Sequence, residues 1–283
     1  MISAKIIEDS ASNFGKRLTT FELNYPRCIH GEVMTHRVFS RNAMSSRAIP
    51  VAKMVGQVRL NPFMPMHWGM NQPGMQASNV ADESTQAQAE AIWLKAANAA
   101  ADAATELADL GLHKQNVNRL LEPFQWMRTI LTGTEFDNFF ELRNHPDAEP
   151  HFQVLAYEMK LAMSESVPVL RNPTPAVNTE NWHLPYILPE EREAASFLHL
   201  AKISAARCAR VSYLTHDQKR PTLQEDIALY ERLAGGAPIH ASPLEHQGFP
   251  AARLDMRSGN FNGWIQYRQI AETNTKDEHA IQN

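Results

Sequence analysis

The spacing of apolar residues along the chain predicts several helices. Residues 82–110 place isoleucine and leucine among alanines and other strong helix formers, and Gly111 follows as a natural stop. Residues 117–163 predict a helix, a break and a second helix, because Pro146 and Pro150 interrupt the pattern. Further helices are expected over residues 190–213 and 222–234.

Other stretches lack the helical period. Residues 17–25 alternate well enough for a strand, and Pro26 is expected to end it or to mark a sheet edge. Residues 60–76 contain three prolines, two glycines and four methionines, which predicts a long loop. The proline-rich stretch 168–189 predicts an ordered connector. Helices outnumber strands and no internal repeat occurs, so we expect one α+β domain over residues 1–283.

The stretch THRVFSRNAMSSR, residues 35–47, is polar almost throughout. We expect it to form a helix or a helix-like turn. On a helix it would present two faces, one formed by His36, Ser40 and Ala43 and the other by Arg37, Arg41 and Met44. A segment that is polar on every side does not resemble core. It indicates the lining of a site for a negatively charged ligand.

Composition and charge narrow the classes of function. An apolar fraction of 43% over 283 residues can build a real core. No apolar run approaches the roughly 18 residues that cross a membrane, and the start lacks a signal-peptide core, so we expect a cytoplasmic protein. A net charge of −4 argues against nucleic acid as a partner. The two cysteines fit a reducing compartment, and His240 and His246 have no further ligand nearby, so no metal site is expected.

Phosphate binding would need side chains, because Walker-type and G-x-G-x-x-G loops are absent. A single arginine is more often a surface residue, and clustering around the polar stretch raises the odds of a role in binding. The arginine candidates are Arg37, Arg47, Arg119 and Arg143.

Two nucleophile patterns are not favoured. Cys28, close to a histidine in PRCIHGE, has the chemistry of a nucleophile, but a half-buried strand cysteine that simply packs is the preferred interpretation. Ser242, Glu245 and His246 lie within five residues of one another and lack a G-x-S-x-G elbow, which argues against a hydrolase triad.

Several segments together resemble the flavin-dependent thymidylate synthases. HRVFSRNAMSS, residues 36–46, contains His-Arg, seven further residues and Ser45, followed by Arg47, as in the signature of that family. Three other blocks are similar to family segments: ARCARVSYL at 206–214, HASPLEHQGF at 240–249, and the pair NRLLEP and NFFELR at 118–123 and 138–143.

The order of the blocks differs from the usual order in the family. The signature block (17–60) and the helical blocks (82–163) come first here, whereas the R-V-S and P-x-E-H blocks (200–250) precede the signature in the family. The simplest explanation is a circular permutation of a single domain, which requires native termini that lie close together on the surface. Chance matches in an unrelated protein are the less favoured alternative.

The resemblance implies a fold, a reaction and an assembly. The expected fold is helix-rich, with an antiparallel sheet and flanking helices. The expected enzyme binds FAD, uses NADPH as reductant, and transfers a one-carbon unit from methylenetetrahydrofolate to carbon 5 of dUMP without an enzyme cysteine. The expected assembly is a homotetramer with shared active sites.

The resemblance also implies roles for individual residues. The residues assigned to FAD are His36, Arg37, Asn42, Asn138, Ser212, Ser242 and Glu245. The residues assigned to the nucleotide are Glu32, Ser45, Ser46, Arg47, Arg119 and Arg143. The catalytic candidates are Arg143, Ser45 and His240. A guanidinium at Arg143, set against the pyrimidine, would stabilise negative charge as carbon 5 attacks.

Four positions depart from the family pattern. Thr35 replaces an arginine, Ala43 a glutamate, Glu32 a glutamine and Asp147 a histidine. These changes leave two alternatives open. One is a nucleotide hydroxymethylase that forms 5-hydroxymethyl-dUMP, or the dCMP product if Glu32 accepts a hydrogen bond from a cytosine amino group. The other is a catalytically inactive flavin- or nucleotide-binding protein.

Overall fold

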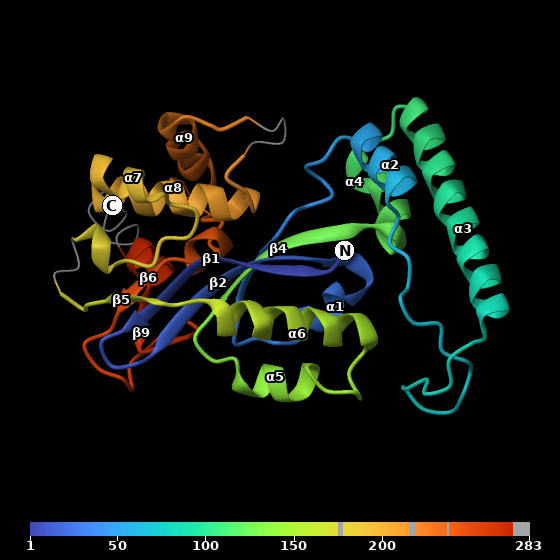
Figure 1. Ribbon diagram of the computed structural model, residues 1–283. Coiled ribbons are helices and arrows are strands. Elements are labelled where there is room, and N and C mark those ends of the chain that lie inside the picture. The colour runs from blue at the N-terminus through green and yellow to red at the C-terminus, as the bar shows by residue number, and fades with distance from the viewer. Residues whose placement is uncertain (175–177, 215–218, 237, 274–283) are drawn as a thin grey trace.

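A five-stranded sheet forms the centre of the protein (Figure 1). The computed structural model describes residues 1–174, 178–214, 219–236 and 238–273. The strand order is β3-β4-β2-β1-β5, and neighbours are antiparallel except the parallel pair β1 and β5. The strands are β1 (Ser3–Ser12), β2 (Arg17–Pro26), β3 (Ser40–Ala43), β4 (Trp126–Gly133) and β5 (Val169–Arg171). The α+β class is confirmed, and the expected antiparallel sheet holds for all strands but β5.

The strand predicted over 17–25 is confirmed as β2. It pairs with β1 on one side and β4 on the other, so Pro26 ends a central strand and does not mark an edge. Phe21, Leu23 and Tyr25 point to the same face and are fully buried. This alternation is what made the strand visible in the sequence.

Strand β4 was missed, because residues 117–163 had been expected to be helical on both sides of a break. Its residues from Thr129 to Thr132 are buried on both faces of the sheet, so no alternation of apolar and polar residues marks the strand. Strand β1 was missed as well. Its sequence, SAKIIEDSAS, mixes polar residues into both faces.

Helices α5 (Asp137–Arg143) and α6 (Pro150–Glu165) cover one face of the sheet (Figure 1). The expected break around Pro146 and Pro150 is confirmed. Phenylalanines from both helices pack against alternate residues of β2 and β4 in the largest core cluster. This packing fixes where α5 ends, and so where the side chain of Arg143 lies.

The opposite face carries two separate groups of helices (Figure 1). At one end lies α2 (Val51–Leu60), and α3 (Glu83–Asp109) packs against it beyond the end of the sheet. Over the other lie α7 (Pro189–Ala194), α8 (Phe197–Arg210) and α9 (Leu223–Ala234).

Three of the predicted helices are confirmed as continuous elements: α6, which is the second helix expected within 117–163, α3 and α9. Helix α3 matches the prediction over 82–110: Asp82 caps it by accepting from the backbone N–H of Thr85, and Gly111 follows with a φ of 82°. Helix α9 matches the prediction over 222–234. The helix predicted over 190–213 is wrong in part, because Ala195 and Ser196 are extended and separate α7 from α8.

The remaining elements are short. They are η1 (Arg27–Ile29), α1 (His30–Val33), α4 (Lys114–Val117), η2 (Asn118–Phe124), η3 (Thr179–Asn181), η4 (Ser242–Glu245), and the strand pairs β6 (Gly248–Pro250) with β9 (Trp264–Gln266) and β7 (Arg257–Ser258) with β8 (Phe261–Asn262). The ordered connector expected over 168–189 contains β5 and η3, and its residues 175–177 lie outside the described part. The loop predicted over 60–76 is confirmed from residue 61 onward, and within the chain Trp68 packs edge-on against Trp93 of α3.

A buried ion-pair network anchors α8. Arg207 donates to Glu191 of α7 at 2.7 Å and to Asp226 of α9 at 2.8 Å, and all three side chains are almost fully buried. The network holds the last turn of α8 in place, and that turn borders the site described below. None of the described helices is long and apolar enough to span a membrane.

Candidate functional site

The polar stretch 35–47 forms a turn and an edge strand, so the helix expected there is wrong. Residues 40–43 form β3, which lies at one edge of the described sheet and pairs with β4. Because alternate residues of a strand point to opposite faces, Ser40 and Asn42 face the α8 side and Ala43 faces the α6 side. The motif therefore supplies side chains to both faces of the sheet edge.

Beneath this edge, His36 and Arg143 form a direct contact. Nε of Arg143 donates to Nε2 of His36 at 2.9 Å, and the guanidinium lies over the ring of Phe152 at 4.8 Å. Burial and the charge of Arg143 lower the pKa of His36 to about 4, so the imidazole is neutral and can accept this bond. Nη1 of Arg143 lies 3.9 Å from Oε2 of Glu32. Of the residues assigned to the nucleotide, Glu32 and Arg143 are thus side by side.

On the other face, Asn42 joins three parts of the chain. Its Nδ2 donates to the backbone oxygens of Cys208 at 2.9 Å and Ala209 at 3.2 Å, in the last turn of α8. Its Oδ1 accepts from the hydroxyl of Ser242 at 3.1 Å. Ser212 lies just beyond the same helix end, where its Oγ accepts from the backbone N–H of Leu214. The signature, R-V-S and P-x-E-H blocks therefore meet in space.

Glu245 faces the edge strand with two arginines nearby. It forms an ion pair with Arg268, and its charge opposes the lowering of the pKa of Arg41 that burial causes. Arg268 was missed in the sequence, because no local pattern distinguishes it in FNGWIQYRQI. His240 is exposed, at the start of the loop that leads to η4.

The residues expected to hold a phosphate lie at the other end of the motif. Ser45 and Arg47 are exposed, and Oγ of Ser45 accepts from the backbone N–H of Arg47 at 3.3 Å. Asn118 fixes this turn by donating to the backbone oxygens of Ser46 at 2.7 Å and Ile49 at 3.0 Å. Asn118 thereby places the neighbouring Arg119, which pairs with Glu122 at 3.1 Å.

The exposed cations of the polar stretch suit an anionic ligand. Arg37 and Arg47 are exposed, and neither forms an ion pair with a carboxylate in the described part of the chain. Asn138, at the start of α5, is exposed too. Cations without carboxylate partners are available to phosphates, whereas a paired arginine would first have to lose its partner.

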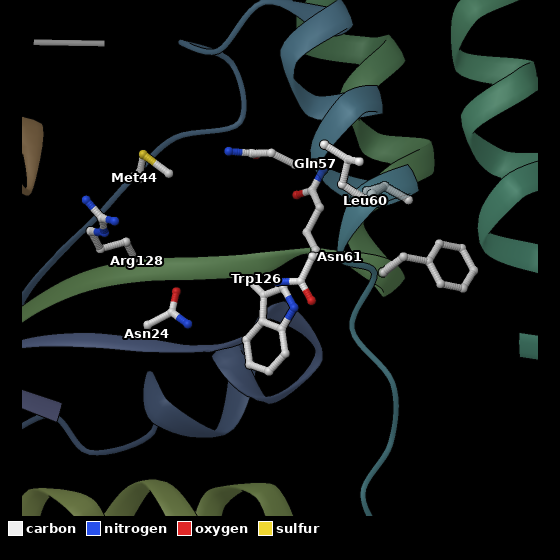
Figure 2. A pocket seen from close by; sticks show the side chains of 10 residues that line it. Asn24, Met44, Gln57, Leu60, Asn61, Trp126 and Arg128 are labelled. Carbon is white, nitrogen blue, oxygen red and sulfur yellow. The ribbon is translucent and has the colours of Figure 1, made fainter. Parts of the chain in front are cut away.

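A separate pocket of about 290 Å³ lies on the sheet face near α2 (Figure 2). Four amide side chains, those of Asn24, Gln57, Asn61 and Gln125, line it together with Met44, Val58, Leu60, Phe124, Trp126 and Arg128. Met44 is the residue it shares with the polar stretch. The pocket opens on the face opposite to Arg143, because Trp126 and Arg128 alternate with core residues that pack against α6. The predicted nucleotide residues therefore do not line it.

A chain of buried hydrogen bonds crosses the sheet behind the P-x-E-H block. His246 contacts Thr132 at 2.8 Å, Thr132 contacts Thr20 at 2.7 Å, and Thr20 contacts His183 at 2.7 Å. Nε2 of His246 is buried without a partner among the described residues. No local sequence pattern indicates this chain of hydrogen bonds, because it depends on the register of β2 and β4.

Cys28 is not a strand residue as expected. It lies in η1 and reaches the surface. Desolvation and the charge of Glu149 raise the pKa of its thiol to about 11, which disfavours the reactive thiolate. This raised pKa agrees with the sequence-based interpretation that disfavours Cys28 as a nucleophile.

One of the comparisons with known proteins gives a family match. The family model described as thymidylate synthase complementing protein matches residues 7–169, a range that ends before both C-terminal blocks. No curated protein matches the chain. Two crystal structures of a UMP/dUMP methylase, PolB from Streptomyces cacaoi, bound with 5-Br UMP and 5-Br dUMP, are similar at 16% identity with a TM-score of 0.49, over 60% of this chain and 91% of theirs.

Proposed function

Because this chain belongs to the thymidylate synthase complementing protein family, we propose that it transfers a one-carbon unit from methylenetetrahydrofolate to carbon 5 of a pyrimidine nucleotide monophosphate, with FAD as cofactor and NADPH as reductant. The signature makes dUMP the expected nucleotide. The observation that carries the proposal is the convergence on Asn42 of three blocks that lie far apart in the sequence.

The residues proposed to bind the two ligands come from both faces of the sheet edge. His36, Arg37, Asn42, Asn138, Ser212, Ser242 and Glu245 hold the flavin, which supplies the hydride that completes a methyl group. Ser45, Ser46, Arg47 and Arg119 hold the nucleotide phosphate. His240 is exposed and near enough in sequence to Ser242 to border the ligand.

Arg143 is the proposed catalytic group. Its Nε is held by His36 and its guanidinium plane is held by Phe152, so little motion is left to the two terminal nitrogens. A cation fixed in advance stabilises negative charge that develops on the pyrimidine as carbon 5 attacks. Ser45 assists by holding the phosphate and with it the position of the ring.

We further infer that the chain is a circular permutant of the family domain. The contacts of Asn42 with Cys208, Ala209 and Ser242 support this, since segments that precede the signature in the family lie beside it here. The family match over residues 7–169 also supports it, because a collinear match cannot continue through relocated blocks.

A homotetramer with shared active sites is part of the proposal. Exposed apolar side chains are frequent on the 61–81 loop and on α3, including Met66, Met70, Met75, Val80 and Ile92. Surfaces of this kind are typical of contacts between subunits. Light scattering coupled to gel filtration, on the purified protein, measures the assembly directly.

The test of the function uses purified protein in three steps. Titration with FAD should change the flavin absorbance, NADPH should then bleach it, and incubation with dUMP or dCMP and methylenetetrahydrofolate should yield a methylated nucleotide by mass spectrometry. Protein that binds flavin and nucleotide but makes no product would instead support the inactive binding protein. Protein that shows no flavin absorbance change would remove the basis of the proposal.

A nucleotide hydroxymethylase is the second candidate. The observation that favours it is the altered charge around the nucleotide, with Thr35 and Ala43 in place of an arginine and a glutamate and Asp147 in place of a histidine. In that reaction water, and not hydride, adds to the exocyclic methylene group on carbon 5, so no reductant is consumed. The product mass and the requirement for NADPH separate the two reactions.

A further inference from the structure

A carboxylate and a guanidinium lie side by side where the proposed function would place the pyrimidine base. Glu32 lies in α1, and Arg143 is the last residue of α5, 111 positions further along the chain. Oε2 of Glu32 lies 3.9 Å from Nη1 of Arg143. The distance is longer than a hydrogen bond, so the two groups remain available to a ligand between or above them.

Both side chains have polar atoms that no described residue engages in a hydrogen bond. Arg143 uses Nε for His36, and among the described residues nothing accepts from its Nη2. Glu32 is partly exposed, and the described residues provide no donor within hydrogen-bond distance of its carboxylate. The neighbouring carboxylate, Glu149, is already engaged because it caps α6 and contacts His151 at 2.6 Å.

The carboxylate acceptor of Glu32 and the guanidinium donors of Arg143 match, in order, the hydrogen-bonding groups along the Watson–Crick edge of cytosine. Cytosine presents an amino donor at N4 and two acceptors, N3 and O2, along its Watson–Crick edge. A carboxylate accepts from N4 while an adjacent guanidinium donates to N3 and O2. Uracil presents an acceptor, O4, where cytosine has its donor. The Glu32 carboxylate would then face oxygen lone pairs without a proton between them, which costs binding energy.

We propose that Glu32 is a specificity-determining residue and that, with Arg143, it selects a cytosine nucleotide, dCMP, over dUMP as the substrate of this site. The inference rests on the proposed function, since it changes the base and not the reaction. In either base, carbon 5 loses its proton and gains the bond to the one-carbon unit, while the bond from that unit to the folate nitrogen breaks. A glutamine at position 32, as in the family, can rotate to suit either base, whereas a carboxylate cannot donate.

The experiment compares kcat/KM for dCMP and dUMP with FAD, NADPH and methylenetetrahydrofolate present. The unmodified enzyme should prefer dCMP by about tenfold to a hundredfold, the range that a good bidentate base contact provides. Glu32→Gln should lose most of this preference, chiefly by accepting dUMP. Glu141→Gln, an exposed carboxylate on the same helix as Arg143, is the matched control and should keep the preference.

The outcomes distinguish a failure of the dCMP inference from a failure of the proposed function. An enzyme that uses dUMP at least as well as dCMP, or a Glu32→Gln variant that keeps the preference of the unmodified enzyme, overturns the inference and leaves the function intact. If neither nucleotide is turned over, the proposed function fails, and calorimetric binding of dCMP and dUMP to the flavin-loaded protein decides the inference. Equal affinity, or no binding of either nucleotide, overturns it.

Discussion

The hydroxyl of Ser242 donates to Oδ1 of Asn42 over 3.1 Å, which joins two residues that are 200 positions apart. Asn42 can accept this bond while its Nδ2 satisfies two backbone oxygens at the end of α8. One amide thus connects the edge strand, the R-V-S block and the P-x-E-H block. Its loss should affect both the fold and the flavin site.

Asn42→Ala should lower the free energy of unfolding by about 1–3 kcal/mol, because it leaves two partly buried carbonyl oxygens without this donor. It should also weaken FAD binding, since Ser242 and the end of α8 lose their common contact. Asn138→Ala is the matched variant: its side chain is exposed, so stability should change by less than about 0.5 kcal/mol while FAD binding weakens. Urea unfolding and flavin titration measure the two effects. An Asn42→Ala protein with unchanged stability and flavin affinity would contradict the role given to this contact.

Cys28→Ala should keep full turnover. The reaction needs no thiolate, and a thiol pKa of about 11 leaves very little thiolate at neutral pH. Iodoacetamide should therefore modify Cys28 slowly at pH 7 and faster as the pH rises toward 11. Loss of turnover in a folded Cys28→Ala protein would point back to nucleophilic catalysis.

The sequence predicted those elements whose signals are local. Helix α3 has a capping aspartate, a run of strong helix formers and a terminal glycine, and β2 has a regular alternation. Strand β4 is buried on both faces, so its residues fit a helix as well as a strand. Strand β3 is polar and short, and it exists because its backbone pairs with β4, a long-range contact that no local pattern encodes.

In the candidate site, local motifs likewise predicted individual residues but not the long-range contacts between them. Motif resemblance pointed to Asn42, Ser242 and Arg143, but the partners that hold them could not be predicted. The bond from Arg143 to His36 depends on where α5 ends relative to the sheet edge. The ion pair of Glu245 with Arg268 depends on how the C-terminal segment returns beside β6.

The stability of the protein should fall on acidification partly through His246. Burial lowers the pKa of this histidine from its ordinary 6.5 to about 3. Between these two values the unfolded chain binds a proton that the native chain does not, so the free energy of unfolding decreases as the pH falls from 6.5 toward 3. His246→Asn should reduce the slope below pH 6.5 by up to about 1.4 kcal/mol per pH unit.

Thr132→Val provides the control for this prediction. It removes the hydroxyl that contacts His246 and Thr20, so the protein should be less stable at neutral pH, but His246 stays buried and the slope should persist. Urea unfolding between pH 5 and pH 7.5 would compare the three proteins. If His246→Asn keeps the slope of the unmodified protein, other groups account for the acid sensitivity.

Arg143→Lys should reduce turnover more than it reduces nucleotide affinity. Lysine keeps the positive charge but loses the planar group that bonds to His36 and lies over Phe152, so the cation is no longer held in place. Charge on the pyrimidine grows in the transition state, and the missing contact therefore acts mainly on kcat. Loss of one such donor costs about 3 kcal/mol, on the order of a hundredfold in rate.

Arg47→Lys should instead act mainly on the KM for the nucleotide. A phosphate keeps its charge throughout the reaction, so a phosphate contact stabilises the ground state and the transition state equally. Steady-state kinetics at saturating FAD and NADPH would compare the two variants with the better of dUMP and dCMP as substrate. An Arg143→Lys enzyme with unchanged kcat and only a raised KM would place Arg143 among the groups that bind the nucleotide, and the stabilisation of developing charge would then have to come from another residue.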